Sequence, residues 1–252
     1  MEAAAYRQFQ ALEESHWWFR GRRAVYLGLL RHQLHGARPA RILDLGCGVG
    51  GFLPGLAELG AAVFPTDLSR AALLRCRERG FPAGVVSDGY ALPYASASFE
   101  LVCLFDAIEH IPDDARAMLE VARILAPGGR AIVSVPAYPF LFANNDRVAR
   151  HFRRYTRRSL AHALEQAGLE IERNTHANVF LFPLILPVVL GIKAWETLLG
   201  READPERTNL SWPLPGALHG LLAAVFGAEL PFSRRFDWPV GHSIVAIARK
   251  AS

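Results

Sequence analysis

Three glycines form the stretch of this sequence whose residue types and spacing are most informative about chemistry. Gly46, Gly48 and Gly51 have the spacing G-x-G-x-x-G, and they lie between an apolar run at residues 42–45 and a segment with helical spacing. Glycines in this position let the backbone approach a nucleotide closely. The motif alone does not identify the nucleotide, because it also fits a dinucleotide-binding dehydrogenase in which Asp67 grips a ribose.

Carboxylates recur at three successive apolar runs. Asp44 lies within the first run, Asp67 follows the second and Asp88 follows the third. In open α/β sheets, ligands bind outside the carboxyl ends of the strands, so these positions would line one crevice. Three carboxylates suit a ligand with an ammonium group, ribose hydroxyls and an adenine amine. Each acid taken singly fits a helix cap or a loop charge equally well.

The segment from residue 41 to residue 136 resembles the class I S-adenosylmethionine-dependent methyltransferases, specifically their bacterial small-molecule branch. The matching stretches are ILDLGCGVG at 42–50, TDLS at 66–69, DGYALPY at 88–94, SFELV at 98–102, IEHI at 108–111 and LAPGG at 125–129. The chain departs from the family pattern at Pro65, where glycine is usual, and at Glu100, where aspartate is usual. Neither departure removes a ligand.

The resemblance implies that the cofactor is S-adenosyl-L-methionine. The glycine loop would then hold its methionine part, Asp67 would accept the ribose hydroxyls, and Asp88 would accept the adenine amine. The full set of cofactor-binding residues that the resemblance implies is Asp44, Gly46, Cys47, Gly48, Asp67, Leu68, Asp88, Gly89, Tyr90 and Phe105.

Methyl transfer from a sulfonium demands positioning and a dry site more than covalent chemistry. A base is needed only when the acceptor is a hydroxyl or a protonated amine. By position, His110 is the first candidate, His151 and Tyr155 follow, and Asp146 is a candidate orienting partner. The alternative for His110 is a structural histidine at a helix start. No metal site is predicted, since the three cysteines lack CxxC spacing.

Two further groups are candidates for the acceptor site. His16, Trp17 and Trp18 precede the core and could close over it as a lid, or pack as core residues. Arg154 belongs to a run of six arginines at positions 147, 150, 153, 154, 157 and 158. Such a run favours an anionic partner, although a solvated helix face explains it equally well. These four residues are the predicted substrate contacts.

The elements that must position these residues alternate between strand and helix from residue 41 onward, as a parallel sheet with crossover helices requires. We predict an α/β fold that is Rossmann-like and doubly wound, with a mostly parallel seven-stranded sheet whose last strand is antiparallel. Gly21 is expected to break the first helical segment, and residues 127–129 are expected to close the helix that Asp113 or Asp114 opens. The predicted regions are an N-terminal helical cap at 1–36, the cofactor-binding core at 37–176, a hydrophobic helical insertion at 177–236 and the last strand at 237–252.

The insertion carries two segments of low charge. Residues 179–192 contain no charged side chain, and residues 211–228 contain only His219 as a titratable group. Their prolines and length argue against a membrane span of about 20 residues, so interfacial or core-covering helices are expected. Together with the arginine run, they suit a small-molecule or lipid-linked acceptor, the latter at an anionic membrane surface. A cap over a small apolar substrate and a dimer interface are the alternatives.

Composition adds bounds on location and class. The 252 residues carry a net charge of +4, and the start lacks a basic segment followed by an apolar run. We therefore expect a cytoplasmic protein, in the membrane-bound case at the inner face of the membrane. The rival functions are an NAD-dependent oxidoreductase and a non-catalytic nucleotide-binding protein of the same fold. Nucleic-acid methylation is disfavoured, because residues 105–108 read FDAI in place of the Asn/Asp-Pro-Pro-aromatic motif. The oligomeric state is not predicted.

Overall fold

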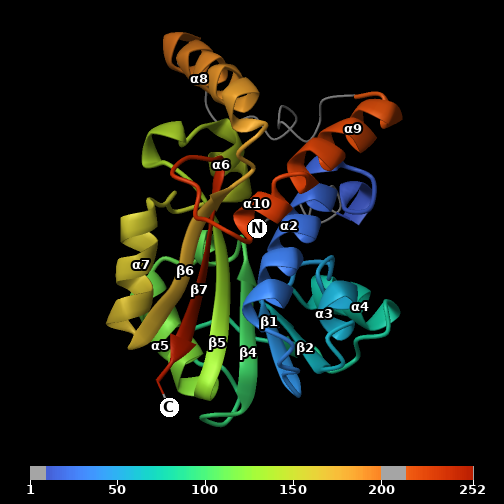
Figure 1. Ribbon diagram of the computed structural model, residues 1–252, viewed down its shortest axis with the longest axis vertical. Helices are drawn as coiled ribbons and strands as arrows, with labels where there is room; N and C mark the ends of the chain where they lie inside the picture. The colour runs from blue at the N-terminus through green and yellow to red at the C-terminus, as the bar shows by residue number, and fades with distance from the viewer. Residues whose placement is uncertain (1–9, 200–213, 252) are drawn as a thin grey trace.

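The sheet that the sequence predicts is present in the computed structural model, which describes residues 10–199 and 214–251 (Figure 1). Its strand order is β3-β2-β1-β4-β5-β7-β6. Strand β7 runs antiparallel to both neighbours, and the other pairs are parallel. The predicted fold is therefore confirmed. The strands are β1 (Arg41–Leu45), β2 (Ala62–Asp67), β3 (Val85–Val86), β4 (Phe99–Phe105), β5 (Leu125–Pro136), β6 (Leu169–Ala177) and β7 (Ser243–Lys250).

Helices cover both faces of the sheet because the central strands are apolar on both sides. Successive side chains of a strand point to opposite faces, so Leu43 packs in a core with α5 and α7, whereas Ile42 packs in a second core with α2, α3 and α4. The helices are α2 (Trp17–Gln33), α3 (Leu53–Ala57), α4 (Arg70–Glu78), α5 (Asp114–Ile124), α6 (Asn144–Ala149), α7 (Arg157–Gln166), α8 (Phe182–Leu199), α9 (Gly216–Gly227) and α10 (Leu230–Ser233), with 3-10 turns η1 (Ile108–His110) and η2 (Pro139–Leu141).

Side-chain caps fix where three of these helices begin. The side chains of Ser69, Asp113 and Thr156 accept hydrogen bonds from the first turns of α4, α5 and α7. A cap of this kind stabilises a helix by about 1 kcal/mol. Sequence spacing predicts Ser69 and Thr156 as helix caps and Asp113 or Asp114 as a helix start, and these predictions are confirmed.

Gly21 does not break the N-terminal helix, so that prediction is wrong. Helix α2 runs without interruption through Gly21, which is buried. A Cβ atom at this position would lie 2.3 Å from Cδ1 of Phe226 in α9. Glycine is present here because another helix approaches the backbone, and sequence spacing carries no information about that contact.

The expected end of α5 is also wrong. The helix ends at Ile124, and strand β5 begins at the next residue and continues through residues 127–129. Phe99 of β4 pairs with Leu125, and the register shifts between Phe99 and Leu101. The Pro-Gly-Gly segment thus lies within an irregular strand rather than at a helix end.

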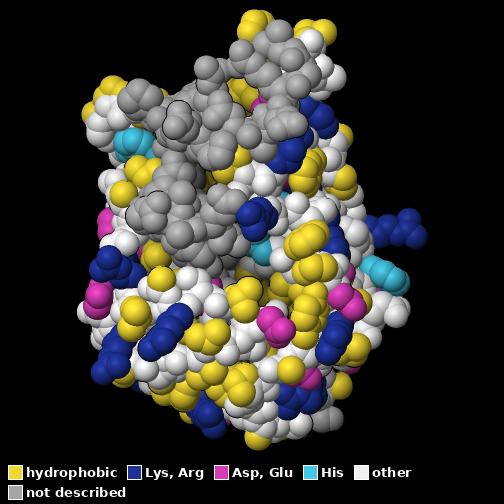
Figure 2. Space-filling model, turned by 180° about the vertical axis from the view of Figure 1, so that it is seen from behind, with side chains coloured by type: hydrophobic (Ala, Val, Ile, Leu, Met, Phe, Trp, Pro, Cys, Tyr) yellow, Lys and Arg dark blue, Asp and Glu magenta, His cyan; other side chains and the backbone are white. Residues whose placement is uncertain are grey.

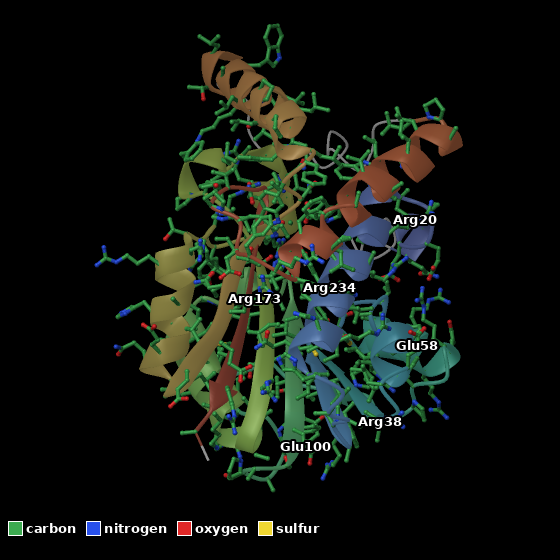
Figure 3. All side chains as sticks on the ribbon, in the orientation of Figure 1. Arg20, Arg38, Glu58, Glu100, Arg173 and Arg234 are labelled. Atoms are coloured by element: carbon green, nitrogen blue, oxygen red, sulfur yellow. The ribbon has the colours of Figure 1, made fainter. Side chains whose placement is uncertain are left out.

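The insertion is helical where the structure describes it. In Figure 1, α8 and α9 extend beyond the sheet on the side where the parallel strands end, and α9 lies along α2. The segment after α10 is fastened to the sheet by Arg173 of β6, which is labelled in Figure 3. The Arg173 guanidinium donates to Asp237 and to the carbonyl of Phe236, both at 2.9 Å. The predicted cap and insertion residues at 1–9 and 200–213 lie outside the described residues.

One stretch of the described chain, Gly216–Ser233, has the length and apolar composition of a membrane span. It comprises α9 and α10, and 22% of it is buried in the molecule. A helix that packs on one side against a soluble core meets the same criterion, so composition alone does not place it in a membrane.

Candidate active site

A cavity of about 460 Å³ lies at the carboxyl ends of β1, β4 and β5. Its wall combines the glycine loop, the start of α2, the segment after β4, helix α6 and the inner sides of α8 and α9. The cavity therefore lies where a doubly wound sheet binds its ligands. Both the predicted cap and the predicted insertion contribute to it.

The glycine loop is held in a conformation that favours glycine. Gly46 and Gly48 have φ of 74° and 55°. A Cβ at Gly46 would lie 2.5 Å from the Cβ of Ala107. Asp67 fastens this loop to the start of α4, because its carboxylate accepts from Gly48 N at 2.9 Å and from Ser69 N at 2.8 Å. The loop is a preformed backbone cradle open to the cavity.

Asp44 is a buried carboxyl group on the cavity wall. It is 2% exposed. Burial, reinforced by the nearby Asp67 carboxylate, raises the pKa of Asp44 to about 8. A cationic ligand beside this group would favour its ionised form and offset the burial. The site thus has a place for an ammonium or sulfonium group.

The predicted cofactor residues fall into two adjoining sets. Five line the cavity, namely Asp44, Gly46, Cys47, Gly48 and Phe105. The others lie at the ends of β2 and β3: Leu68 is 69% exposed, and the exposed Asp88 accepts from the backbone N of Tyr90 at 2.9 Å. Gly89 between them has φ of 85°. The residues of this outer set are not among the described residues that line the cavity.

The polar end of the cavity brings together the predicted residues His110, His151 and Asp146. The rings of His110 and His151 lie 4.6 Å apart, and Nδ1 of His151 lies 2.8 Å from Oδ1 of Asp146. Burial alone would raise the pKa of Asp146, but the hydrogen bond with His151 and the Arg154 guanidinium outweigh it and hold the pKa at about 2. Burial and the adjacent His151 lower the pKa of His110 to about 3. His110 is therefore a neutral imidazole at neutral pH.

The Arg154 guanidinium hydrogen-bonds to other groups of the protein. Its Nε donates to both carboxylate oxygens of Asp146 at 2.9 Å, and its NH1 donates to the carbonyl of Ala137. Arg154 lines the cavity, yet its main effect is to orient Asp146, and through it His151. The predicted contact of Arg154 with the substrate stays a prediction.

Tyr155 is not among the residues of the described chain that line the cavity. Its ring is buried, and its hydroxyl donates to Asp114 at 2.8 Å. Burial and the Asp114 carboxylate raise the pKa of Tyr155. The Tyr155 hydroxyl is thus engaged by Asp114 rather than presented in the described cavity wall, which does not favour Tyr155 as the base.

His16, Trp17 and Trp18 line the cavity and also hold the cap and insertion together. His16 caps α2 by accepting from Trp18 N, and its ring lies 4.8 Å from that of His219 in α9. Burial, with the neighbouring His219, lowers the pKa of His16 to about 4. Trp18 packs against Phe226 and His242. These contacts agree with the packing interpretation, and the lid stays a prediction.

The sequence interpretation missed two functional candidates on the wall, Arg22 and Asp106. Their side chains form an ion pair of 2.5 Å inside the cavity, and Ser134 Oγ donates to Asp106. The Arg22 guanidinium also lies over the rings of Phe19 and Phe52. Two sequence signals could have indicated them: the arginines that follow the tryptophan pair, and the aspartate directly after the fourth strand. In the structure, Asp106 has φ of 53°.

Comparison with known proteins finds methyltransferases. A family model described as a methyltransferase domain matches residues 19–174. A protein of Mycolicibacterium smegmatis named "Probable S-adenosylmethionine-dependent methyltransferase" is 31% identical over 170 residues, which cover 66% of this chain and 64% of that protein. The demethylmenaquinone methyltransferase of Mycobacterium sp. (strain KMS) is 30% identical over 73% of this chain and 75% of its own length.

A solved structure agrees with the fold. The SAM-dependent methyltransferase of Thermotoga maritima superposes with a TM-score of 0.59 at 18% identity, covering 99% of this chain and 100% of that one. The chain spans less than two thirds of the length of the Mycolicibacterium smegmatis relative. The similarity therefore concerns the domain that carries the glycine loop.

Proposed function

Because this chain belongs to the class I S-adenosylmethionine-dependent methyltransferases, we propose that it is an active enzyme that transfers the methyl group to an acceptor held in the cavity. The family membership decides against the NAD-dependent oxidoreductase. The observation that carries the proposal is that the glycine loop and the His110–His151 pair open into one cavity. A methyl donor and a proton-accepting group thus face the same space.

The residues around the loop fit the cofactor. The Gly46 backbone has no room for a side chain, and Asp44 is a buried carboxyl that a cation would stabilise. Arg22 also lines the cavity, and its guanidinium, which is paired with Asp106, has further donors that can meet the carboxylate of the methionine part. When bound, S-adenosylmethionine supplies an electrophilic methyl group. The aromatic rings of Phe52 and Phe105, stacked at 3.9 Å, keep water from this part of the wall.

The acceptor is an amphiphilic small molecule or lipid-linked compound that presents an oxygen or nitrogen atom. Apolar side chains of α8 and α9, among them Leu184, Val188 and Leu222, line one part of the cavity, and the histidine cluster lies in the same wall. A ring or chain would pack on the apolar part while its hydroxyl or amine meets the polar part. The name of the demethylmenaquinone relative supports a compound of this kind.

The polar end can take up the acceptor's proton. His151 is held by Asp146, which stabilises the imidazolium that forms when a proton arrives. Arg154 keeps Asp146 ionised and oriented. His151 can therefore take the proton of a neutral hydroxyl or of an ammonium and leave the acceptor in its nucleophilic form.

The proposed location is the cytoplasm, with contact to an anionic membrane surface. Helix α8 exposes Leu184, Trp195 and Leu198. The arginine run supplies less external charge than its sequence suggests, because Arg147, Arg153 and Arg154 pair with acids. On the face shown in Figure 2, basic side chains are scattered among acidic and apolar ones. Flotation with vesicles of phosphatidylglycerol tests this contact, and absence of binding at low salt would end it.

The acceptor class can be tested with the unmodified chain. The protein is incubated with methyl-labelled S-adenosylmethionine and a bacterial lysate, and the products are divided into lipid-extractable and aqueous fractions. We expect label in the lipid-extractable fraction, and none when His151→Ala replaces the wild type. Label confined to water-soluble products would contradict the amphiphilic acceptor.

A further inference from the structure

The polar end of the cavity has the donor set of a metal site. Glu109, His110 and His151 each present one ligand atom, and these atoms all lie within 4.8 Å of one another. Ligands bound to one ion at about 2.1 Å lie roughly 3 to 4 Å apart, so small side-chain rotations would close the site. We propose that these three residues bind a divalent transition-metal ion at the acceptor end of the cavity.

Glu109 is the observation that points most directly to a cation. Its side chain is 0% exposed and lies on the cavity wall. Neither carboxylate oxygen has a hydrogen-bond partner among residues 10–199 and 214–251. A carboxylate in such a place is costly unless it is protonated or coordinates a cation. An ion at the cavity wall would satisfy both oxygens.

The histidines are oriented as metal ligands usually are. Nδ1 of His151 bonds to Asp146, which leaves Nε2 of that ring for a ligand. Nδ1 of His110 has no partner in the described part of the chain, while the ring hydrogen-bonds the backbone at Ala149 and Arg150. Metal-bound histidines typically donate their second nitrogen to a carboxylate or a carbonyl, and Asp146 and the α6 backbone take these places here.

The backbone also brings the ligands together. The N–H of Phe152 donates to the carbonyl of Glu109 at 2.8 Å, which joins the segment that carries His151 to η1. The three donors thus come from two segments that are fastened directly to each other. Ligand geometry of this kind is preformed rather than assembled by the ion.

Two imidazole nitrogens and one carboxylate favour Zn²⁺, Mn²⁺, Fe²⁺ or Co²⁺ over Mg²⁺ and Ca²⁺, which prefer oxygen ligands. Three protein ligands leave positions open toward the cavity, as in catalytic sites. The role of the ion rests on the proposed function: with His151 bound to the ion, the ion takes over the part that the free ring has in proton removal, because an acceptor hydroxyl bound at an open position would release its proton to water more readily. The oxygen would then attack the methyl carbon while the sulfur–carbon bond breaks and sulfur keeps the electron pair.

Cobalt provides a direct probe of this site. The 252-residue chain, free of any histidine tag and stripped with EDTA, is titrated with Co²⁺ while visible absorption and bound metal are measured. We expect one Co²⁺ per chain, displaceable by Zn²⁺. Glu109→Gln and His151→Ala should each weaken the affinity by about tenfold or more. His162→Ala, which removes an exposed histidine on α7, should bind as the wild type does.

Absence of stoichiometric Co²⁺ binding by the wild type, or equal affinity in both ligand variants, would overturn the proposal. Glu109→Gln keeps the shape of a buried side chain, and His151→Ala changes a partly exposed one, so circular dichroism identifies any variant that fails to fold. S-adenosylhomocysteine binding is measured on the same samples. Binding of the nucleoside without the metal refutes the metal site alone, whereas binding of the metal without the nucleoside refutes the proposed function alone.

Discussion

At the scale of single residues, the cavity is rich in carboxyl groups that are buried or partly buried. Asp44, Asp106, Glu109 and Asp146 all lie on its wall, against the guanidinium groups of Arg22 and Arg154. Each of the two arginines pairs with one acid, which leaves Asp44 and Glu109 at the two ends. A wall of this kind attracts positively charged ligands. The donor's sulfonium and ammonium groups suit the Asp44 end.

Asp44→Asn should stabilise the unliganded protein and weaken cofactor binding. The folded-state pKa of Asp44 is raised to about 8, so the unfolded chain ionises first and the free energy of unfolding falls as pH rises from about 4 to 8. Asparagine does not ionise, so the variant keeps its free energy of unfolding as pH rises. We expect the variant to be more stable by up to about 5 kcal/mol at pH 8, with the difference vanishing near pH 4, in urea titrations. Glu170→Gln, an exposed carboxyl on β6, serves as the control.

His151→Ala should impair turnover more than cofactor binding. The ring lies at the acceptor end and is bonded to Asp146, away from the glycine loop. We expect kcat to fall about 10²- to 10⁴-fold, as for loss of a proton-transferring group, with S-adenosylhomocysteine affinity within about twofold of the wild type. Steady-state kinetics and calorimetry check the two quantities. A variant with unchanged kcat would remove His151 from the mechanism.

At the scale of elements, α2 and α9 pack through glycine. Gly21→Ala places a methyl group against Phe226 and should lower the free energy of unfolding by about 1 to 3 kcal/mol through overpacking. Gly220→Ala on α9 is the matched control, since no atom lies within 4 Å of a Cβ there. It should raise stability by up to about 1 kcal/mol. Equal effects of the two substitutions in urea unfolding would contradict the close approach of the helices.

Glu229 holds the insertion to the end of β6. Its buried carboxylate accepts from the backbone N–H groups of Asn178 and Val179 at 2.8 and 2.7 Å. Glu229→Ala leaves both donors without this acceptor and should cost about 2 to 3 kcal/mol of stability in urea unfolding. Glu165→Ala, at an exposed position of α7, should change stability by less than about 0.5 kcal/mol. Comparable losses for both would show that the Glu229 contact contributes little.

At the scale of the whole molecule, the local parts of the fold were predictable and the long-range contacts were not. Strand alternation and the caps Ser69, Asp113 and Thr156 depend on neighbouring residues, so sequence patterns report them. The Arg22–Asp106 pair joins residues 84 positions apart. Its formation depends on how α2 crosses the sheet, which no local pattern encodes.

At the acceptor end of the cavity, too, residue types were predictable from the sequence and long-range contacts were not. His110 and His151 were candidates because of their residue types and their place in the chain. Their ring contact depends on the Phe152–Glu109 backbone bond across 43 positions of chain. The neighbouring Tyr155 fits the same sequence description and points to Asp114 instead. Sequence spacing therefore proposed the right segment without resolving which side chains face the cavity.

The central claim, that this cavity and the adjoining sheet edge bind S-adenosylmethionine, is tested most directly by thermal unfolding with the product nucleoside. At a concentration of S-adenosylhomocysteine near 100 times Kd, binding should add about 2.7 kcal/mol and raise Tm by roughly 5 to 10 °C. NAD⁺ at the same concentration should leave Tm unchanged. An unchanged Tm with S-adenosylhomocysteine, or an equal rise with NAD⁺, would contradict the account.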